Sequence, residues 1–372
     1  MSESTPARSR TPAALIVLTL AYAAGIALVT LHPWQGWLPW SSLSALALAY
    51  LVEPWPRYWT VFDFVTNLLA YLPLGALLAA TLMARRRALG ALAGAIVICA
   101  LMSLALETLQ ILLPGRVPSR ADWVANVIGA TSGALLAGAI GRERIRYWPD
   151  RLRGVLPFAP GASAGLLLIG AWFAAQLYPQ SMTFATGELL DQVALWFGPE
   201  VPDMLMVSFG VGTMALAEAL AVAFTVVAVG LIVVDLLRPG SYPAIPVGIT
   251  IALAALVKSA ASAWLLGSGA ALVWLSAGAQ GGILVGALAV ALLAWLPKRG
   301  RLIVATAALI VATVLFNIIG PNPYFHSMMA LWDQGRWINL NGLWRGTALA
   351  WPFAAILYCL LRASRARPEQ RR

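Results

Sequence analysis

Long apolar segments separated by short polar ones run through most of this chain. A helix needs about 20 mainly apolar residues to cross a bilayer, and ten segments approach or exceed that length. The ten predicted spans are residues 13–31, 61–84, 88–113, 121–140, 161–178, 204–237, 243–266, 270–296, 302–319 and 343–361. The pattern therefore predicts an all-α integral membrane protein with about ten transmembrane helices.

Three segments test this number of spans. Residues 13–31 follow two arginines like a signal peptide, but the apolar stretch is longer than a typical signal core of about 7–15 residues, so we expect a retained span. Residues 41–52 are apolar but too short to cross, and nearby tryptophans predict an interfacial or re-entrant piece. Residues 204–237, with Glu218 near the middle, are interpreted as one long or broken span.

Composition and charge agree with this class. The chain is 60% hydrophobic and 11% charged, whereas soluble domains have about a quarter of charged residues. An even number of spans places both termini on one side, and a cytoplasmic N-terminus puts 19 of the 25 basic residues inside. This asymmetry follows the positive-inside rule and accounts for the net charge of +10. No run mixes basic and aromatic residues as a nucleic-acid surface would, so we expect no nucleic-acid partner.

Cysteine and histidine give little indication of special chemistry. Cys99 and Cys359 lie inside apolar runs, where free cysteine packs as a small apolar residue. His32 and His326 lie outside the spans and far apart in sequence. We therefore expect no disulfide, no metal site and no cofactor.

A basic linker divides the chain into two membrane domains. The predicted parts are a four-helix domain at 13–140, the linker at 141–157, a six-helix domain at 158–362 and a basic cytoplasmic tail at 363–372. Two outer loops of the six-helix domain are long: residues 179–203 are acidic, and residues 320–342 contain Trp and Asn. Two interpretations stay open for both loops, amphipathic segments on the outer surface or a cap over a ligand site.

Eight polar residues gather at one predicted membrane face of the first domain. Acids and amides occur at i,i+4 in spans two and four and at i,i+3 in span three, and two arginines accompany the loop between spans three and four. The residues are Asp63, Asn67, Glu107, Gln110, Arg116, Arg120, Asp122 and Asn126. Polar groups inside a membrane are functional-site candidates by default. We predict that these side chains line one extracytoplasmic ligand-binding pocket.

Structural roles are an alternative for most of these residues. Asp63 and Asp122 stand at helix N-termini, where acids cap backbone N–H groups, and Ser119 before Asp122 fits a capping box. The two asparagines could serve only as hydrogen bonds between helices.

Glu107 differs from the other acids of this cluster. It lies near a helix C-terminus, where the helix dipole disfavours negative charge. We expect Arg116 or Arg120 to compensate it, and we interpret Glu107 as functional.

Small residues and proline predict how these spans pack. Gly90 and Gly94 on span three and Gly129 and Gly133 on span four form GxxxG patterns, which allow helices to approach closely. Pro73 inside span two predicts a kink.

The motifs together resemble those of a known family. The order Asp63…Asn67…Pro73-Leu74-Gly75 and then Glu107…Gln110…Arg116…Asp122…Asn126…Gly129 is similar to the VanZ-like family over roughly residues 20–140. Its members are bacterial membrane proteins with four or more spans, and the name comes from a member linked to teicoplanin resistance. The resemblance implies a multi-pass protein of the bacterial cytoplasmic (inner) membrane that acts on the cell envelope, with a link to glycopeptide antibiotic resistance. The six C-terminal spans lie outside the core motif.

Three functions are compatible with the sequence. The first is binding or modification of a polar envelope ligand at the outer face, such as a lipid-linked saccharide or a peptidoglycan precursor. The second is an enzyme with Glu107 or Asp122 as general acid or base. The third is a transporter or flippase with a polar path through Glu218 and Lys258, two charges that alternatively form a structural bridge.

Overall fold

The computed structural model describes residues 13–32, 36–43, 48–52, 55, 60–84, 87–145, 157–159, 161–198, 200–207, 210–320 and 338–366. The chain forms two compact units, Met1–Leu156 and Pro157–Arg372. Apart from two isolated β-bridges, every regular element in the described part of the chain is a helix.

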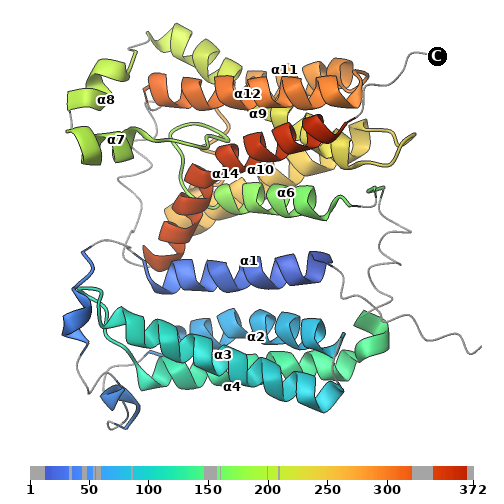
Figure 1. The fold of residues 1–372 in the computed structure, drawn as a ribbon. Helices are drawn as coiled ribbons and strands as arrows, with labels where there is room; N and C mark the ends of the chain where they lie inside the picture. Colours follow the sequence, from blue (N-terminus) through green and yellow to red (C-terminus); the bar gives the residue numbers. More distant parts are fainter. Residues whose placement is uncertain are drawn as a thin grey trace, which may run out of the picture. The chain divides into compact units, whose positions relative to one another are not determined.

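Among its described residues, the first unit includes four long helices and two short 3-10 turns, and Figure 1 labels the four helices. The long helices are α1 (Ala13–Thr30), α2 (Val61–Met83), α3 (Ala88–Gln110) and α4 (Arg120–Ile140). Two turns, η1 (Trp40–Ser42) and η2 (Ala49–Leu51), replace a fifth span between α1 and α2. The described part of residues 41–52 therefore contains no spanning helix, as the short apolar segment predicted.

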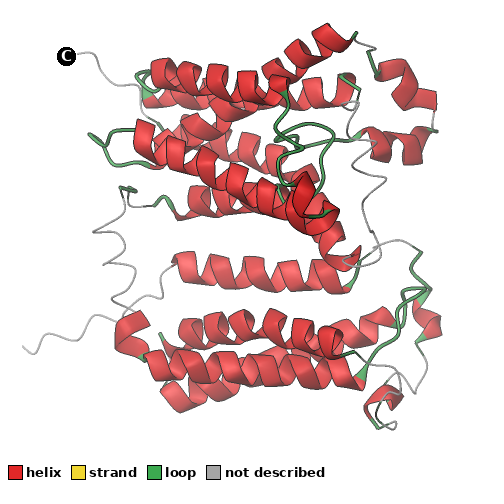
Figure 2. Cartoon of the chain, turned by 180° about the vertical axis from the view of Figure 1, so that it is seen from behind, coloured by secondary structure: helices red, strands yellow, loops and turns green. Residues whose placement is uncertain are grey.

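The second unit contains six long or medium helices, two short ones and one 3-10 turn (Figure 2). Its helices are α6 (Ser163–Ala175), α7 (Leu190–Phe197), α8 (Glu200–Leu205), α9 (Val211–Leu236), α10 (Ala244–Leu266), η3 (Ser268–Ala270), α11 (Ala277–Leu293), α12 (Lys298–Ile318) and α14 (Ile338–Arg365). The acidic loop at 179–203 contributes α7 and α8, and α9 is one unbroken helix. Most of the loop at 320–342 lies outside the described residues.

The ten predicted apolar segments correspond to ten helices of the structure. Seven of the described helices are long and apolar enough to cross a membrane, and three apolar helices, α1, α6 and α11, are shorter. Seven of the ten predicted spans thus correspond to helices that could cross a membrane, and the number of spans and the side of the termini stay predictions. The protein is an integral membrane protein of helical class.

Helix α9 forms the centre of the second unit. It packs against α11 and α12, and its second half is buried on every face, including the fully buried Leu231, Ile232 and Leu236. A helix that is apolar all round belongs in the interior of a membrane bundle, which agrees with the burial of this half of α9.

Glycines set the close approach of α2 and α4 in the first unit. A Cβ atom added at Gly129 or Gly133 would overlap the carbonyl oxygens of Leu68 and Leu72 on α2, and one at Gly75 would overlap Ala130 on α4. The predicted GxxxG contact is confirmed for α4. The corresponding prediction for Gly90 on α3 is wrong, because nothing lies within 4 Å of the added Cβ there.

A non-helical segment continues α6 inside the protein. Helix α6 has only 13 residues, about 20 Å at 1.5 Å per residue, which is shorter than the membrane core. Between it and α7, residues 182–187 are all buried, and Phe184 has φ of 62°. Asn317 of α12 holds this backbone by donating to the Gly187 carbonyl at 2.7 Å and accepting from the Leu189 N–H at 2.7 Å. Irregular backbone at membrane depth is tolerated where protein buries it.

Candidate functional site

Two acids of the first unit, Asp63 and Asp122, lie in the first turns of α2 and α4. The Thr60 hydroxyl caps α2 by accepting from the Asp63 N–H at 3.0 Å and donates to the Asp63 carboxylate at 2.6 Å. The Ser119 hydroxyl caps α4 by accepting from the Asp122 N–H at 3.4 Å. The predicted cap at Ser119 is therefore confirmed, whereas the cap of α2 is Thr60 and not the acid Asp63. Asp63 is exposed, whereas Asp122 is half-buried.

The acids and amides of α2 and α4 meet where the glycine contact brings these helices together. Asn67 lies within hydrogen-bonding reach of the Asp122 carboxylate, and Asp63 is near enough to act on that carboxylate electrostatically. Both asparagines face inward, with Asn67 half-buried and Asn126 only 4% exposed. This part of the predicted cluster thus forms one continuous patch.

Glu107 is the most deeply buried acid of the cluster. Its side chain on α3 is 3% exposed, and its Oε2 accepts the Ser119 backbone N–H at 3.0 Å. Asp122 and Arg116 act on it electrostatically. The expected compensation by an arginine is electrostatic, from Arg116, and the direct hydrogen bond comes from the N-cap backbone of α4. An N-terminal backbone N–H is a good partner for a carboxylate, since the helix dipole is positive there.

The remaining predicted residues hold the end of α1. Arg116 donates to the His32 carbonyl from Nε at 3.1 Å and from Nη2 at 2.8 Å, and Gln110 donates to the Thr30 carbonyl at 3.0 Å. These carbonyls lack helical partners because α1 ends at Thr30. Burial lowers the pKa of the Arg116 guanidinium, and Glu107 opposes that change. Arg120 is the first residue of α4, and it also interacts with another residue.

Three polar residues near Glu107 were missed from the sequence. Ser103 on α3 is fully buried and accepts from Asn126 Nδ2 at 3.0 Å. Tyr71 on α2 is 2% exposed and lies beside both Ser103 and Glu107. Tyr50 of η2 lies beside Thr108 and Glu107, and burial raises the pKa of its phenol. Ser103 and Tyr71 continue the i,i+4 spacing by one turn, so the same periodicity could have found them.

The cluster is not arranged as a metal centre. Among the described residues, no group of three or more His, Cys, Asp or Glu side chains is placed to hold a metal ion. The side chains instead offer carboxylate and amide oxygens, one backbone-bound carboxylate and several hydroxyls, a set suited to hydrogen-bonding a polar ligand.

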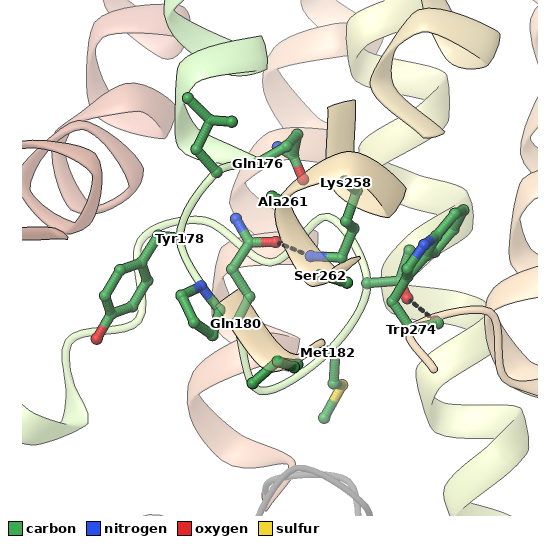
Figure 3. A pocket seen from close by; sticks show the side chains of 12 residues that line it. Gln176, Tyr178, Gln180, Met182, Lys258, Ala261, Ser262 and Trp274 are labelled. Atoms are coloured by element: carbon green, nitrogen blue, oxygen red, sulfur yellow. Dashed lines mark hydrogen bonds between the residues drawn. The ribbon is translucent and has the colours of Figure 1, made fainter. Parts of the chain in front are cut away.

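The second unit has a separate polar centre around Lys258 of α10 (Figure 3). Its Nζ is buried and donates to Gln180 Oε1 at 2.9 Å. Glu218 of α9 is 1% exposed and accepts from the Ser276 hydroxyl at 2.7 Å, and it acts on Lys258 electrostatically together with Glu188. Lys258 and Glu218 thus interact electrostatically, and they also have hydrogen bonds to Gln180 and Ser276.

A small cavity adjoins Lys258. It has a volume of about 20 Å³, which is enough for a water molecule. The non-helical segment after α6 supplies Gln176, Gln180 and Thr183 to its wall, and Trp274 closes another side (Figure 3). Gln176 is 1% exposed, and its Oε1 has no hydrogen-bond partner.

A buried ion-pair network at the other end of α9 was also missed from the sequence. The fully buried Asp235 carboxylate pairs with Lys298 of α12 at 3.1 Å and with Arg362 of α14 at 2.8 Å. Its signal was a single acid within an apolar span, three residues before Arg238.

The apolar helices and buried polar centres define a multi-pass helical membrane protein. Residues 9–141 match the family model described as VanZ/LLP1. This match confirms the resemblance to the VanZ-like family over that part of the chain, and the rest of the chain is a helical extension. Searches among curated proteins and among solved structures found no match.

Proposed function

We propose that the first unit binds or modifies a polar cell-envelope ligand, a lipid-linked saccharide or a peptidoglycan precursor, at the cluster around Glu107. The observation that carries this proposal is the burial of Glu107 beside Asp122, Asn67 and Asn126. Burying carboxylates in a membrane protein is costly, and such groups usually mark substrate or ion sites.

The structure narrows the residues that would contact this ligand. Gln110 and Arg116 donate to carbonyls at the end of α1, and the Asp63 carboxylate accepts a hydrogen bond from the Thr60 hydroxyl. We therefore assign ligand contact to Glu107, Asp122, Asn67 and Asn126, and support of the pocket to the other predicted residues.

Binding to purified protein in nanodiscs tests the proposal. The parent protein should bind the lipid-linked disaccharide–peptide precursor of peptidoglycan, and Glu107→Gln should weaken binding by about tenfold or more, because a hydrogen bond to a charged group is worth about 1.5–3 kcal/mol. Glu143→Gln is the matched control, since Glu143 is an exposed acid of the same unit. Equal affinity of the parent and Glu107→Gln would refute the proposal.

The same variants test the link to glycopeptide resistance that the family suggests. Expression of the parent in a susceptible host should raise the teicoplanin concentration needed to stop growth. Glu107→Gln, expressed to the same level in the membrane, should lose this effect.

A transporter or flippase is the second candidate, and the segment after α6 favours it. Transporters commonly place substrate or ion sites where a helix is interrupted inside the membrane, and here such a segment meets the buried Lys258. If this candidate is right, Lys258→Met should abolish uptake or flipping while precursor binding at the first unit is preserved. Unchanged transport in Lys258→Met would exclude this path.

A further inference from the structure

The polar centre of the first unit is rich in hydrogen-bond acceptors. Asn126 Oδ1 is buried and has no hydrogen-bond partner. Glu107 uses its Oε2 for the Ser119 N–H, and Asp122 adds a second carboxylate within electrostatic range. A buried acceptor without a donor costs about 1–3 kcal/mol, so a ligand that fits this place should bring hydrogen-bond donors.

The negative charges of this polar centre also favour a ligand that carries hydrogen-bond donors. Asp122 acts on Glu107, and Asp63 acts on Asp122. Arg116, the cation that acts on Glu107, donates from Nε and Nη2 to the His32 carbonyl. The carboxylates therefore disfavour a phosphate at this place, and a sugar hydroxyl would supply a donor without positive charge.

A primary ammonium group satisfies both requirements. It has three N–H donors and no acceptor, and its hydrogen bonds to carboxylates are charge-assisted. We propose that the first unit recognises a primary ammonium group of its ligand, with Glu107, Asp122 and Asn126 as the acceptors. This inference rests on the proposed function and specifies which part of the ligand the site reads.

Two sources could present this group at the membrane surface. One is the amine of an aminophospholipid headgroup, and the other is a free amine on the peptide of an envelope precursor. Both share the ammonium chemistry, so matched pairs that differ only in N–H donors separate the sources.

The first arm compares the peptidoglycan precursor carrying a free peptide amine with the same precursor after acetylation of that amine. Parent protein in nanodiscs should bind the free amine about tenfold or more tightly, the size of one charge-assisted hydrogen bond. Glu107→Gln and Asp122→Asn should lose this preference, and Glu143→Gln should keep it. Two separate variants are used so that failure of one to fold leaves the other informative.

The second arm compares phosphatidylethanolamine with phosphatidylcholine, whose headgroup has the same charge but no N–H. Native mass spectrometry of the parent should show retention of phosphatidylethanolamine over phosphatidylcholine if the lipid is the source, and Asp122→Asn should remove the difference. A preference in either arm that depends on Glu107 or Asp122 supports the inference and identifies the source.

Other outcomes separate this inference from the proposed function. If the parent binds free and acetylated precursor equally and Glu107→Gln weakens both, the proposed function stands and the ammonium assignment is wrong. If precursor does not bind and the two lipids are retained equally, both are wrong. A preference for the amine that persists in Glu107→Gln and in Asp122→Asn overturns the inference, because the amine would then be read elsewhere.

Discussion

The two units bury carboxylates in opposite ways. In the second unit, the Asp235 carboxylate is paired with two cations: Lys298 lies 3.1 Å from one oxygen, and Arg362 donates to the other at 2.8 Å. In the first unit, Glu107 is just as inaccessible, but its direct partner is a single backbone N–H at Ser119. Arg116, the nearby arginine of that unit, donates to the backbone carbonyl of His32.

This difference distinguishes a structural charge from a site charge. Breaking a buried ion pair by removing one partner is strongly destabilising, because it leaves a charge without compensation. Asp235 joins α9, α12 and α14 in this way, and its charge is compensated by two cations. Glu107 keeps unused acceptor capacity close to Asp122, which is the expected state of a group that binds something else.

The largest effect on stability is expected at Asp235, the carboxylate that is paired with two cations. Asp235→Ala should lower the free energy of unfolding by about 3–5 kcal/mol, because it leaves Lys298 and Arg362 without their shared partner. Unfolding in mixed detergent micelles measures this, with Glu200→Ala as the control because Glu200 is an exposed acid of the same unit. A loss below about 1 kcal/mol would mean that Asp235 does not lock the three helices.

The helix contact that assembles the first site should be nearly as sensitive. Gly133→Ala should cost about 3 kcal/mol, because the new methyl group meets backbone of α2 at Leu72 and Ala76 and overpacking of a tight contact is destabilising. Gly90→Ala is the matched control and should be neutral or stabilise by up to about 1 kcal/mol, since Ala favours helix and the position is open. Similar stabilities for the two variants would contradict the close approach of α2 and α4.

The smallest change in stability is expected at Glu107. Glu107→Gln keeps the shape of the side chain and its acceptor for the Ser119 N–H, so unfolding should change by less than about 1 kcal/mol. Thermal unfolding in the same micelles, measured beside Asp235→Asn, tests the contrast between the two carboxylates. A destabilisation of Glu107→Gln as large as that of Asp235→Asn would assign Glu107 a structural role.

Local patterns predicted much of the first unit. Apolar segment length located its four helices, and Ser119 before α4 marked the cap that it provides. The i,i+4 spacing also placed Asp122 and Asn126 on one face. These features depend on residues within a turn or two of each other, so a single sequence contains the needed information.

Other features depend on contacts between distant segments. Nothing near Arg116 in the sequence indicates that its guanidinium binds the His32 carbonyl, 84 residues away. The partners of Asp235 lie on two other helices. The sequence placed the buried backbone after α6 in an outer loop, and its burial became visible only in the structure.

By itself, the sequence determined the membrane class, the positions of ten apolar helices and the set of polar residues worth considering. The physical reason is that hydrophobicity, helix periodicity and capping are properties of short stretches of chain. Only the tertiary structure decided which polar groups compensate one another, because hydrogen bonds and ion pairs depend on the distance between side chains after the helices have packed. That pairing distinguishes Glu107, whose direct partner is a backbone N–H, from Asp235, whose charge is compensated by two cations.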